Sequence, residues 1–501
     1  MERVQDSLLK GAVTVGERQA LIIDGNTTSY ADLVRGVGGV ALYLKQAGTK
    51  SGDRVAFESR SKLAFIQTFF GIVSVGAVAV PIGDGASGQT VSEIVTRTSP
   101  RFVLSDRDLA LETKVVALAD VLAAIPDLAI AIETLDETRV GDASPALIMF
   151  TSGTTANKKG VILSHRNLCR AVENINAAMG VDDTIREYVT IPLHHSFGLG
   201  RVRCVVAAGG TLAMNNGPFS PLALAQTVRR FSLNALSGVP AVFGTLIEAF
   251  ERLVEQFGTG ISVVEIGSAE MPRAHKERLL QLLPNARIFM HYGLTEASRS
   301  TFVEFRSQWD HIDTVGRAAP NVAVTIRDEQ GRLVPDVDVG EIVVSGPHVC
   351  EGYLDNPELQ SARFRPEGFF TGDFGRLNAD GFLTLIGRKD DMINYGGVKL
   401  SPLEIERHLA GVLQACDFAV VGLDDPNGLA GQIPVLAWTR AAQSTQLALG
   451  NAAIASLADA VLDRNCVPRQ IIEVARIPRT ANGKVRRAEL RQLLKEDCAA
   501  K

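Results

Sequence analysis

The chain has 501 residues, of which 46% are hydrophobic and 21% are charged, a composition typical of a globular protein large enough to form more than one domain. Its formal net charge of −5 and its pI of about 6.0 provide no overall positive field, which disfavours nucleic acid as a main partner. Its six cysteines are widely spaced without a Cys-x-x-Cys pair, so neither a zinc site nor a disulfide framework is expected, and a cytoplasmic location with mostly buried thiols is predicted.

The first part of the chain predicts a soluble protein without a membrane span. Residues 1–18 lack the apolar core of a signal peptide. The most apolar window, residues 64–82, contains polar residues, glycines and a proline, and is predicted to be a buried helix that leads into a core strand. Residues 36–41 imitate a dinucleotide fingerprint. They lie inside a helix predicted for residues 29–44, so close helix packing is the better interpretation of their glycines.

Short strand-like runs alternate with helical patterns through the first 270 residues. The predicted strands are 21–23, 54–58, 77–81, 102–104, 146–150, 161–163, 188–192, 211–214, 235–237 and 263–266. This alternation predicts an α/β fold whose large N-terminal domain consists of layered α/β sheets.

The pattern changes twice toward the C-terminus. After about residue 320, short strands separated by Gly, Asp and Pro turns predict a small antiparallel β-subdomain. After residues 388–391 the chain restarts with strand and helix patterns and ends in a basic helix at 486–495. We therefore expect an N-terminal domain at residues 1–387 and a small α+β C-terminal domain at residues 392–501.

Residues 150–160, Phe-Thr-Ser-Gly-Thr-Thr-Ala-Asn-Lys-Lys-Gly, have the composition of a phosphate-binding loop. The hydroxyls begin where a predicted buried strand ends, the usual place for a ligand loop in an α/β sheet. Gly153 permits backbone N–H groups to approach phosphate oxygens, and Lys159 supplies positive charge. The segment is not a Walker A motif, because no Gly-Lys-Ser/Thr closes it. Its composition alone leaves a surface turn as the alternative.

Later segments also place chemically useful side chains at strand ends or turns. Residues 191–198 join a strand end to a glycine-rich turn with an imidazole and an aromatic ring, and residues 267–272 follow a strand with small residues. Residues 291–296, His-Tyr-Gly-Leu-Thr-Glu, combine a ring that can stack on a base with a carboxylate that can bind Mg²⁺. Residues 370–373 end a strand with a carboxylate, and residues 478–487 form a polar turn with one lysine. Each segment taken alone is equally compatible with an ordinary loop.

Together these segments resemble the motifs of the acyl-adenylate-forming superfamily, which includes acyl-CoA synthetases, peptide-synthetase adenylation domains and firefly luciferase. The resemblance covers roughly residues 20 to 490 in the family's order. The phosphate loop departs from the family pattern twice, with Ala156 in place of a glycine and Lys158 in place of a proline. The resemblance implies a two-step ligase that uses ATP and Mg²⁺ and whose mobile C-terminal domain rotates between the two steps.

The resemblance assigns roles to individual residues. Those that contact ATP or AMP are Thr151, Ser152, Gly153, Thr154, Thr155, Lys159, Ser268, Ala269, Glu270, His291, Tyr292, Gly293, Thr295, Asp373, Arg388 and Lys484. The carboxylic acid is expected to contact His195, Phe197, Gly198, Val239, Gly267, Gly293, Leu294 and Ala297. The catalytic residues are Lys484, His195 and Glu296; Glu296 and Thr155 bind the metal; Asp390 is the hinge and Gly397 lines the acceptor channel.

The motifs leave the substrate and the acceptor open. Residues 191–200 contain no acid to pair with an ammonium, which disfavours an α-amino acid, since an unpaired buried charge is costly. An aliphatic or alicyclic acid is favoured, with an aryl or β-amino acid as the alternative. The acceptor is predicted to be the thiol of coenzyme A or of the phosphopantetheine of an acyl carrier protein, or else the amine of an amino acid.

Three further questions are left open by the sequence. Arg201 and Arg203 are interpreted as solvated or ion-paired structural arginines rather than as contacts to a second substrate carboxylate. A monomer or a homodimer is expected. A non-catalytic binding protein of the same fold is the alternative from a different functional class, and a luciferase-type oxygenase has no positive support.

Overall fold

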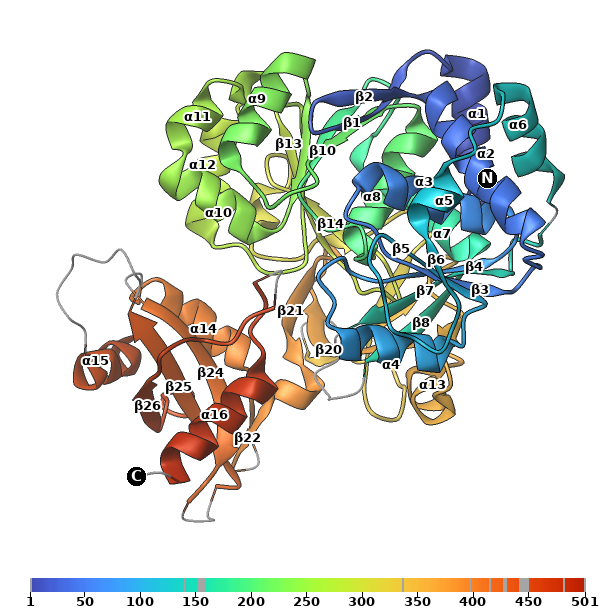
Figure 1. Ribbon diagram of the computed structural model, residues 1–501. Helices are drawn as coiled ribbons and strands as arrows, with labels where there is room; N and C mark the ends of the chain where they lie inside the picture. The colour runs from blue at the N-terminus through green and yellow to red at the C-terminus, as the bar shows by residue number, and fades with distance from the viewer. Residues whose placement is uncertain are drawn as a thin grey trace. The chain divides into compact units, whose positions relative to one another are not determined.

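The computed structural model describes residues 2–138, 140–151, 158–335, 338–396, 398–413, 416–426, 430–440, 450–480 and 483–499 (Figure 1). The chain divides into two compact units, which are described separately. Unit 1 contains Met1–Ser152, Lys158–Ala323 and Val344–Phe364, and unit 2 contains Gly153–Asn157, Val324–Val343 and Arg365–Lys501.

The larger sheet of unit 1 has nine strands in the order β15-β14-β13-β12-β11-β9-β10-β1-β2. In that order they span Arg317–Ala318, Thr301–Glu304, Arg287–Tyr292, Val263–Ile266, Ala235–Gly238, Arg186–Val189, Thr211–Met214, Gln19–Ile23 and Asn26–Ser29. Neighbours from β13 to β1 are parallel, whereas β14, β15 and β2 pair antiparallel with their neighbours. A parallel core of this kind brings the carboxyl ends of its strands to one edge.

Successive residues of these strands face opposite sides of the sheet, because side chains alternate along a pleated strand. Leu236, Val264 and Ile288 belong to a buried core that also contains residues of the helices on that side. These helices are α9 (Pro221–Phe231), α10 (Pro240–Ala249), α11 (Glu251–Glu255) and α12 (Arg273–Leu282) (Figure 1). The alternate residues face the other side, where helix α8 (Ser196–Ala208) contacts β9 and β10.

The second sheet of unit 1 has seven strands in the order β18-β8-β7-β4-β3-β5-β6. They span Gly352–Tyr353, Lys159–Ser164, Pro145–Thr151, Val78–Pro81, Arg54–Phe57, Phe102–Ser105 and Val115–Ala117. Strands β7 and β8 form an antiparallel hairpin, and β18 pairs antiparallel with β8. The remaining helices of unit 1 are α1 (Asp6–Val15), α2 (Tyr30–Gln46), α3 (Lys62–Ser74), α4 (Gly88–Thr98), α5 (Leu118–Leu122), α6 (Leu128–Glu137), α7 (His165–Met179) and α13 (Pro357–Arg363).

The glycines of helix α2 serve close helix packing, as predicted. A Cβ atom on Gly36 would lie 1.9 Å from the Gln67 side chain of α3, and one on Gly38 would lie 2.6 Å from the Ala131 side chain of α6. No side chain fits at either position without displacing its neighbour. The apparent dinucleotide fingerprint is therefore explained by packing.

Unit 2 contains most of a five-stranded sheet and two further sheets. The five strands are β16 (Ala323–Arg327), β17 (Gly340–Ser345), β20 (Gly368–Leu377), β19 (Phe364–Arg365) and β21 (Leu383–Arg388). Strands β22 (Ile393–Tyr395) and β23 (Val398–Leu400) pair with each other, and β24 (Cys416–Asp424), β25 (Gln432–Arg440) and β26 (Gln470–Glu473) form a three-stranded sheet. The helices are α14 (Pro402–Ala410), α15 (Asn451–Val461) and α16 (Arg487–Ala499).

The three-stranded sheet of unit 2 is covered on both faces. Val420 of β24 belongs to a core with residues of α14 and α15, whereas its neighbours Ala419 and Val421 belong to a core with Leu490 and Leu494 of α16. The alternation along β24 thus places α16 on the face opposite to α14 and α15 (Figure 1). The α+β character predicted for this part of the chain is confirmed. The predicted domain boundary at residues 388–391 and the mobility of residues 392–501 stay predictions.

Two local predictions are wrong. The strand predicted for residues 188–192 ends at Val189, and Phe197 and Gly198 lie in helix α8 rather than in a glycine-rich turn. Asp373 does not end a strand, because β20 continues through it to Leu377.

Two predictions about the whole chain can be compared with the described residues. Among them, no helix has both the length and the apolar character needed to cross a membrane. The thiols of Cys169, Cys204 and Cys350 are buried, and those of Cys416 and Cys466 are half-buried, as predicted for a chain without disulfide bonds in its described part.

Candidate active site

Four of the predicted ligand-binding segments leave the same edge of the nine-stranded sheet. Strands β9, β11, β12 and β13 lie side by side and are parallel, so their carboxyl ends meet at one edge. The segments that follow them contain His195, Val239, Gly267 and Gly293 respectively. The fold therefore brings together segments that are separated by up to about 100 residues in the sequence.

The segment after β9 leads into helix α8, with His195 at the position before its first residue. The rings of His194 and His195 lie 4.2 Å apart between centroids. Burial lowers the pKa of His194 to about 4 and also lowers the pKa of His195, so both imidazoles are neutral at physiological pH. A Cβ on Gly198 would lie 2.3 Å from the carbonyl oxygen of Pro192, which explains why glycine occupies the first turn of this helix.

The segments after β11 and β12 place small residues beside the His291 ring. Val239 is buried at the start of helix α10. A Cβ on Gly267 would lie 2.1 Å from Cε1 of His291, so this position accepts no side chain. Ser268 has a φ of 76°, a left-handed conformation that is uncommon outside glycine. Ala269 is half-buried and Glu270 is exposed.

The segment after β13 makes a tight turn around Glu296. Backbone hydrogen bonds join Leu294 and Ala297 in both directions, at 3.1 and 3.2 Å, and Thr295 between them is half-buried. Tyr292 and Glu296 are buried. The Tyr353 hydroxyl of β18 donates a hydrogen bond of 2.9 Å to Oε1 of Glu296, which fixes the carboxylate.

Strand β18 connects Glu296 to the predicted phosphate-binding hairpin. Tyr353 pairs with Val161 of β8, and the Leu354 N–H donates a hydrogen bond of 2.8 Å to the carbonyl oxygen of Gly160. Burial and the Glu296 carboxylate raise the pKa of Tyr353, so its hydroxyl remains a donor. Through Tyr353 of β18, Glu296, the predicted metal ligand, is thus connected to strand β8, which begins with Lys159.

The described part of the phosphate-binding hairpin is its stem. Thr151, the last residue of β7, pairs with Lys159, the first residue of β8. Lys158 donates a hydrogen bond of 3.0 Å from Nζ to the Thr90 hydroxyl of α4, and Arg97 of α4 donates to its carbonyl oxygen. Five residues of the loop lie outside the described residues. They are the predicted ligands Ser152, Gly153, Thr154 and Thr155, and Ala156, which departs from the family pattern.

In unit 2, two of the residues predicted to contact the nucleotide lie close together. Asp373 and Arg388 face each other across β20 and β21, with 3.2 Å between Oδ1 and Nε. Lys484 is exposed in a turn where its N–H donates to the Thr480 hydroxyl at 3.1 Å. Asp390 is exposed, and its carbonyl oxygen accepts a hydrogen bond of 3.3 Å from Arg491 of α16. Gly397 lies outside the described residues.

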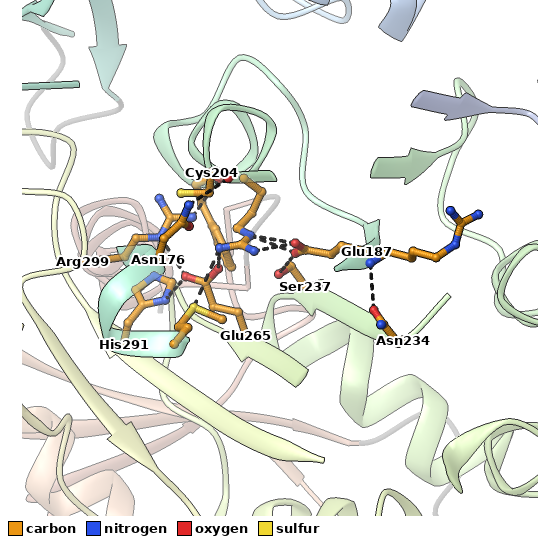
Figure 2. A network of polar contacts seen from close by, with 12 residues as sticks. Asn176, Glu187, Cys204, Asn234, Ser237, Glu265, His291 and Arg299 are labelled. Atoms are coloured by element: carbon orange, nitrogen blue, oxygen red, sulfur yellow. Dashed lines mark hydrogen bonds and ion pairs between the residues drawn. The ribbon is translucent and has the colours of Figure 1, made fainter. Parts of the chain in front are cut away.

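A buried charged network, which the sequence did not predict, lies in unit 1 between the nine-stranded sheet and helix α8 (Figure 2). Arg201 of α8 contacts Glu187 of β9, with 2.9 Å between Nε and Oε1, and contacts Glu265 of β12, with 3.2 Å between Nη1 and Oε2. Glu265 Oε1 also lies 2.8 Å from Nε of Arg299 and 2.9 Å from Nδ1 of His291. Arg201 is therefore an ion-paired structural arginine, as predicted. Arg203 is instead buried and donates a hydrogen bond of 2.8 Å to the carbonyl oxygen of Leu168, so the prediction of a solvated or ion-paired residue is wrong for it.

Strand geometry explains why this network forms. Glu187, Glu265 and His291 occupy the strand positions that alternate with the apolar core on the other face, so they all project toward α8. Glu265 stands in an otherwise apolar strand sequence, Val-Val-Glu-Ile, whereas Glu187 follows an arginine in Arg-Glu-Tyr-Val. A carboxylate in a core strand requires a buried partner of opposite charge. The carboxylates in these strands were therefore the sequence signal that could have indicated the network.

The network is balanced in charge when His291 is neutral. Glu187, Glu265, Arg201 and Arg299 are each at most 2% exposed. Burial acts to raise the pKa of Glu265, but Arg299 and Arg201 outweigh it and hold that pKa well below its usual range. Burial lowers the pKa of His291 despite the neighbouring carboxylate, so the imidazole stays neutral. Two buried anions are thus paired with two buried cations.

Comparisons with known proteins agree with this architecture. The model of the AMP-binding enzyme family matches residues 10–354. Feruloyl-CoA synthase from Amycolatopsis sp is 29% identical, with 93% of this chain and 94% of the relative covered. Indoleacetate–CoA ligase from Aromatoleum aromaticum is 29% identical, with 93% of each covered. The crystal structure of ATP-bound MatB from Rhodopseudomonas palustris matches with a TM-score of 0.88 at 25% identity over 99% of each chain. The chain therefore belongs to the AMP-binding enzyme family, the family of acyl-adenylate-forming ligases that its motifs predicted.

Proposed function

We propose that the protein activates a carboxylic acid with ATP and transfers the acyl group to the thiol of coenzyme A. The observation that carries the proposal is the convergence of the segments after β9, β11, β12 and β13 at one edge of the parallel sheet. Three of these segments contain the predicted acid-binding residues His195, Val239 and Gly267, and the fourth contains Glu296. The same edge thus offers groups for an acid and for a nucleotide.

The first step is adenylation. A carboxylate oxygen attacks the α-phosphorus of ATP, the bond from that phosphorus to the bridging oxygen of the β-phosphate breaks, and pyrophosphate leaves with the electron pair. Lys484 offsets the negative charge that builds up on the phosphoryl oxygens during the attack. The neutral imidazole of His195 lies beside the acid carboxylate without neutralising it.

The second step is acyl transfer. The thiol sulfur attacks the carbonyl carbon of the acyl-adenylate, the carbon–oxygen bond to AMP breaks, and the thiol proton is released. Asp373 and Arg388, which face each other in unit 2, are the residues expected to contact the two ribose hydroxyls. Asp390 is the hinge for the domain rotation that separates the two steps, and Gly397 lines the channel of the entering thiol.

The residues present suit Mg²⁺ bound together with ATP. Mg²⁺ is commonly held by one or two carboxylates together with phosphate oxygens and water, so a single buried carboxylate at Glu296 is sufficient. Among the described residues, no group of three or more acidic, histidine or cysteine side chains forms a complete protein site. The ion supplies charge neutralisation for the leaving pyrophosphate, and Tyr353 keeps Glu296 in a fixed orientation.

The substrate is a carboxylic acid without an ammonium group. The absence of an acidic residue from positions 191–200 and the neutral rings of His194 and His195 support a substrate that brings no positive charge. The sequence favours an aliphatic or alicyclic acid, whereas the names of the feruloyl and indoleacetate relatives support an aryl acid. Coenzyme A is the favoured acceptor because both relatives are named as CoA ligases.

The test is carboxylate-dependent ATP–pyrophosphate exchange over a panel of fatty, alicyclic, aryl and amino acids. At least one acid without an ammonium group should support exchange, and α-amino acids should not. Mass analysis of the products with coenzyme A, a phosphopantetheinylated carrier protein and free amino acids then identifies the acceptor. No exchange with any acid would contradict the proposal and favour a binding protein of the same fold.

A further inference from the structure

Two donors converge on a single oxygen of the buried network. Nδ1 of His291 and Nε of Arg299 lie 2.9 and 2.8 Å from the same atom, Oε1 of Glu265 (Figure 2). The contact from Nδ1 is an approach of 2.9 Å without the angle of a hydrogen bond, and because an ionised carboxylate repels a ring lone pair, the tautomer with the proton on Nδ1 is favoured. The neutral ring then has its lone pair on Nε2. Glu265 therefore determines the tautomer of His291.

Burial is the main reason that the pKa of this ring is lowered, and the charge of Arg299 acts in the same direction. The charged groups that act on His291 are Glu265 on β12, Arg201 on α8 and Arg299 itself. Its aromatic neighbours, Phe197 on α8 and Phe302 on β14, carry no charge. Because Arg201 and Arg299 already balance Glu187 and Glu265, a proton on His291 would add a buried cation without its own anion.

Arg299 also holds the first turn of α8 next to this ring. Its Nη2 donates a hydrogen bond of 3.1 Å to the carbonyl oxygen of Phe197, and its guanidinium lies 4.7 Å from the centre of the Phe197 ring. The His291 ring stands edge-on to the same phenyl ring, with 4.8 Å between centroids. A Cβ on Gly200 would lie 2.3 Å from Nη1 of Arg299, so this glycine leaves space for the guanidinium.

We propose that Arg299 is a positioning residue that, together with burial, keeps His291 neutral, holds the Glu265 carboxylate beside its Nδ1 and fixes Phe197 at the acid-binding end of the site. The geometry that carries the proposal is the pair of contacts to one oxygen together with the contact to the Phe197 carbonyl. The expected effect on the binding of the acid rests on the proposed function. The expected effect on the protonation of His291 does not.

The protonation of His291 is measured by NMR titration of protein labelled with ¹³C at histidine Cε1. The chain has eight histidines, and the His291→Gln variant identifies the resonance. In Arg299→Met the repelling cation is lost and Glu265 remains, so the pKa of His291 should rise by at least about one unit, a tenfold shift in its protonation equilibrium. Arg299→Lys retains a positive charge and should keep the pKa close to the wild-type value.

Additional variants separate this effect from loss of structure. Arg299→Gln removes the charge but retains an amide donor for Glu265, so it should show the same raised pKa if Arg299→Met fails to fold. Arg107→Met is the matched control, because it also deprives a buried carboxylate, Glu58, of its arginine but lies in the segment after β5 of the seven-stranded sheet. It should leave the His291 titration unchanged.

The kinetic measurement follows exchange as a function of acid concentration and pH. Arg299→Met should raise KM for the acid about tenfold, with a smaller change in kcat, and should add a pH dependence that follows the titration of His291. A folded Arg299→Met or Arg299→Gln protein with an unchanged His291 titration would overturn the proposal. An altered titration in a protein that catalyses no exchange would instead contradict the proposed function alone.

Discussion

At the scale of single residues, the molecule depends on charges placed in its core. Arg201 contacts two buried carboxylates and has no exposed surface. Removing one partner of a buried ion pair leaves an uncompensated charge, which costs far more than the loss of a surface pair. Arg299 adds backbone strain to this arrangement, since its φ of 53° is unusual for a residue other than glycine. Its contacts to Glu265 and Phe197 hold that conformation.

Arg201→Met should lower the free energy of unfolding by about 3 to 5 kcal/mol, because Glu187 loses its arginine and Glu265 loses one of two. Urea denaturation monitored by circular dichroism measures the change. Arg18→Met is the control, since Arg18 forms an exposed pair with Asp183 and should lose at most about 1 kcal/mol. Equal losses in the two variants would show that the buried network does not stabilise the fold.

Glu296→Gln should reduce the rate of adenylation about 10² to 10³-fold, because a carboxylate that offsets phosphate charge is replaced by a neutral amide. The effect is measured as exchange over a range of Mg²⁺ concentrations. Tyr353→Phe removes only the hydrogen bond to Glu296 and should have a much smaller effect. Unchanged kinetics in Glu296→Gln would remove Glu296 from the predicted metal site.

At the scale of secondary-structure elements, the sequence predicted the strands better than the segments between them. The strands at 211–214 and 263–266 have the predicted bounds, because each is a short apolar run next to turn-forming residues. The start of α8 was missed because Ser-Phe-Gly-Leu-Gly is a poor helical sequence. Gly198 and Gly200 are there because Pro192 and Arg299 approach too closely for a side chain, a tertiary contact that local propensity does not contain.

The interior of β20 was missed for a similar reason. Thr-Gly-Asp reads as a turn, and Gly372 indeed has a φ of 77°. Its N–H donates a hydrogen bond of 2.9 Å to the Glu341 side chain, which satisfies the backbone and lets the strand continue. The charged network was also missed, because pairing between distant strands is needed to bring its members together.

The hairpin of β7 and β8, which is predicted to bind phosphate, is attached to helix α4 through Lys158, one of the two departures from the family pattern. Lys158→Met should raise KM for ATP about 2- to 10-fold, since the hydrogen bond to Thr90 that anchors the stem is worth about 0.5 to 1.5 kcal/mol. Exchange kinetics at saturating acid measure the change. Thr90→Val removes the same bond from the other side and should have a similar effect, with no further loss in the double variant. A normal KM in both single variants would make the anchor irrelevant to ATP binding.

At the scale of the whole molecule, the predicted catalytic groups are divided between the two units. The strand ends, Glu296 and Lys159 belong to unit 1, whereas Asp373, Arg388 and Lys484 belong to unit 2. The sequence places Asp373 in the N-terminal domain and Lys484 in the C-terminal domain, and this division into domains stays a prediction; both residues belong to unit 2. If the C-terminal domain rotates between the two steps, Lys484 acts in adenylation and is dispensable for thiol transfer.

The most direct test compares the two half-reactions of Lys484→Ala. Adenylation is measured as acid-dependent ATP–pyrophosphate exchange, and transfer is measured as thiolysis of chemically prepared acyl-AMP by coenzyme A. Lys495→Ala is the control, because Lys495 belongs to the same unit and pairs with Asp424 on the surface. We predict that Lys484→Ala loses exchange and retains thiolysis, while the control retains both. Normal exchange in Lys484→Ala, or loss of thiolysis together with exchange, would contradict the account.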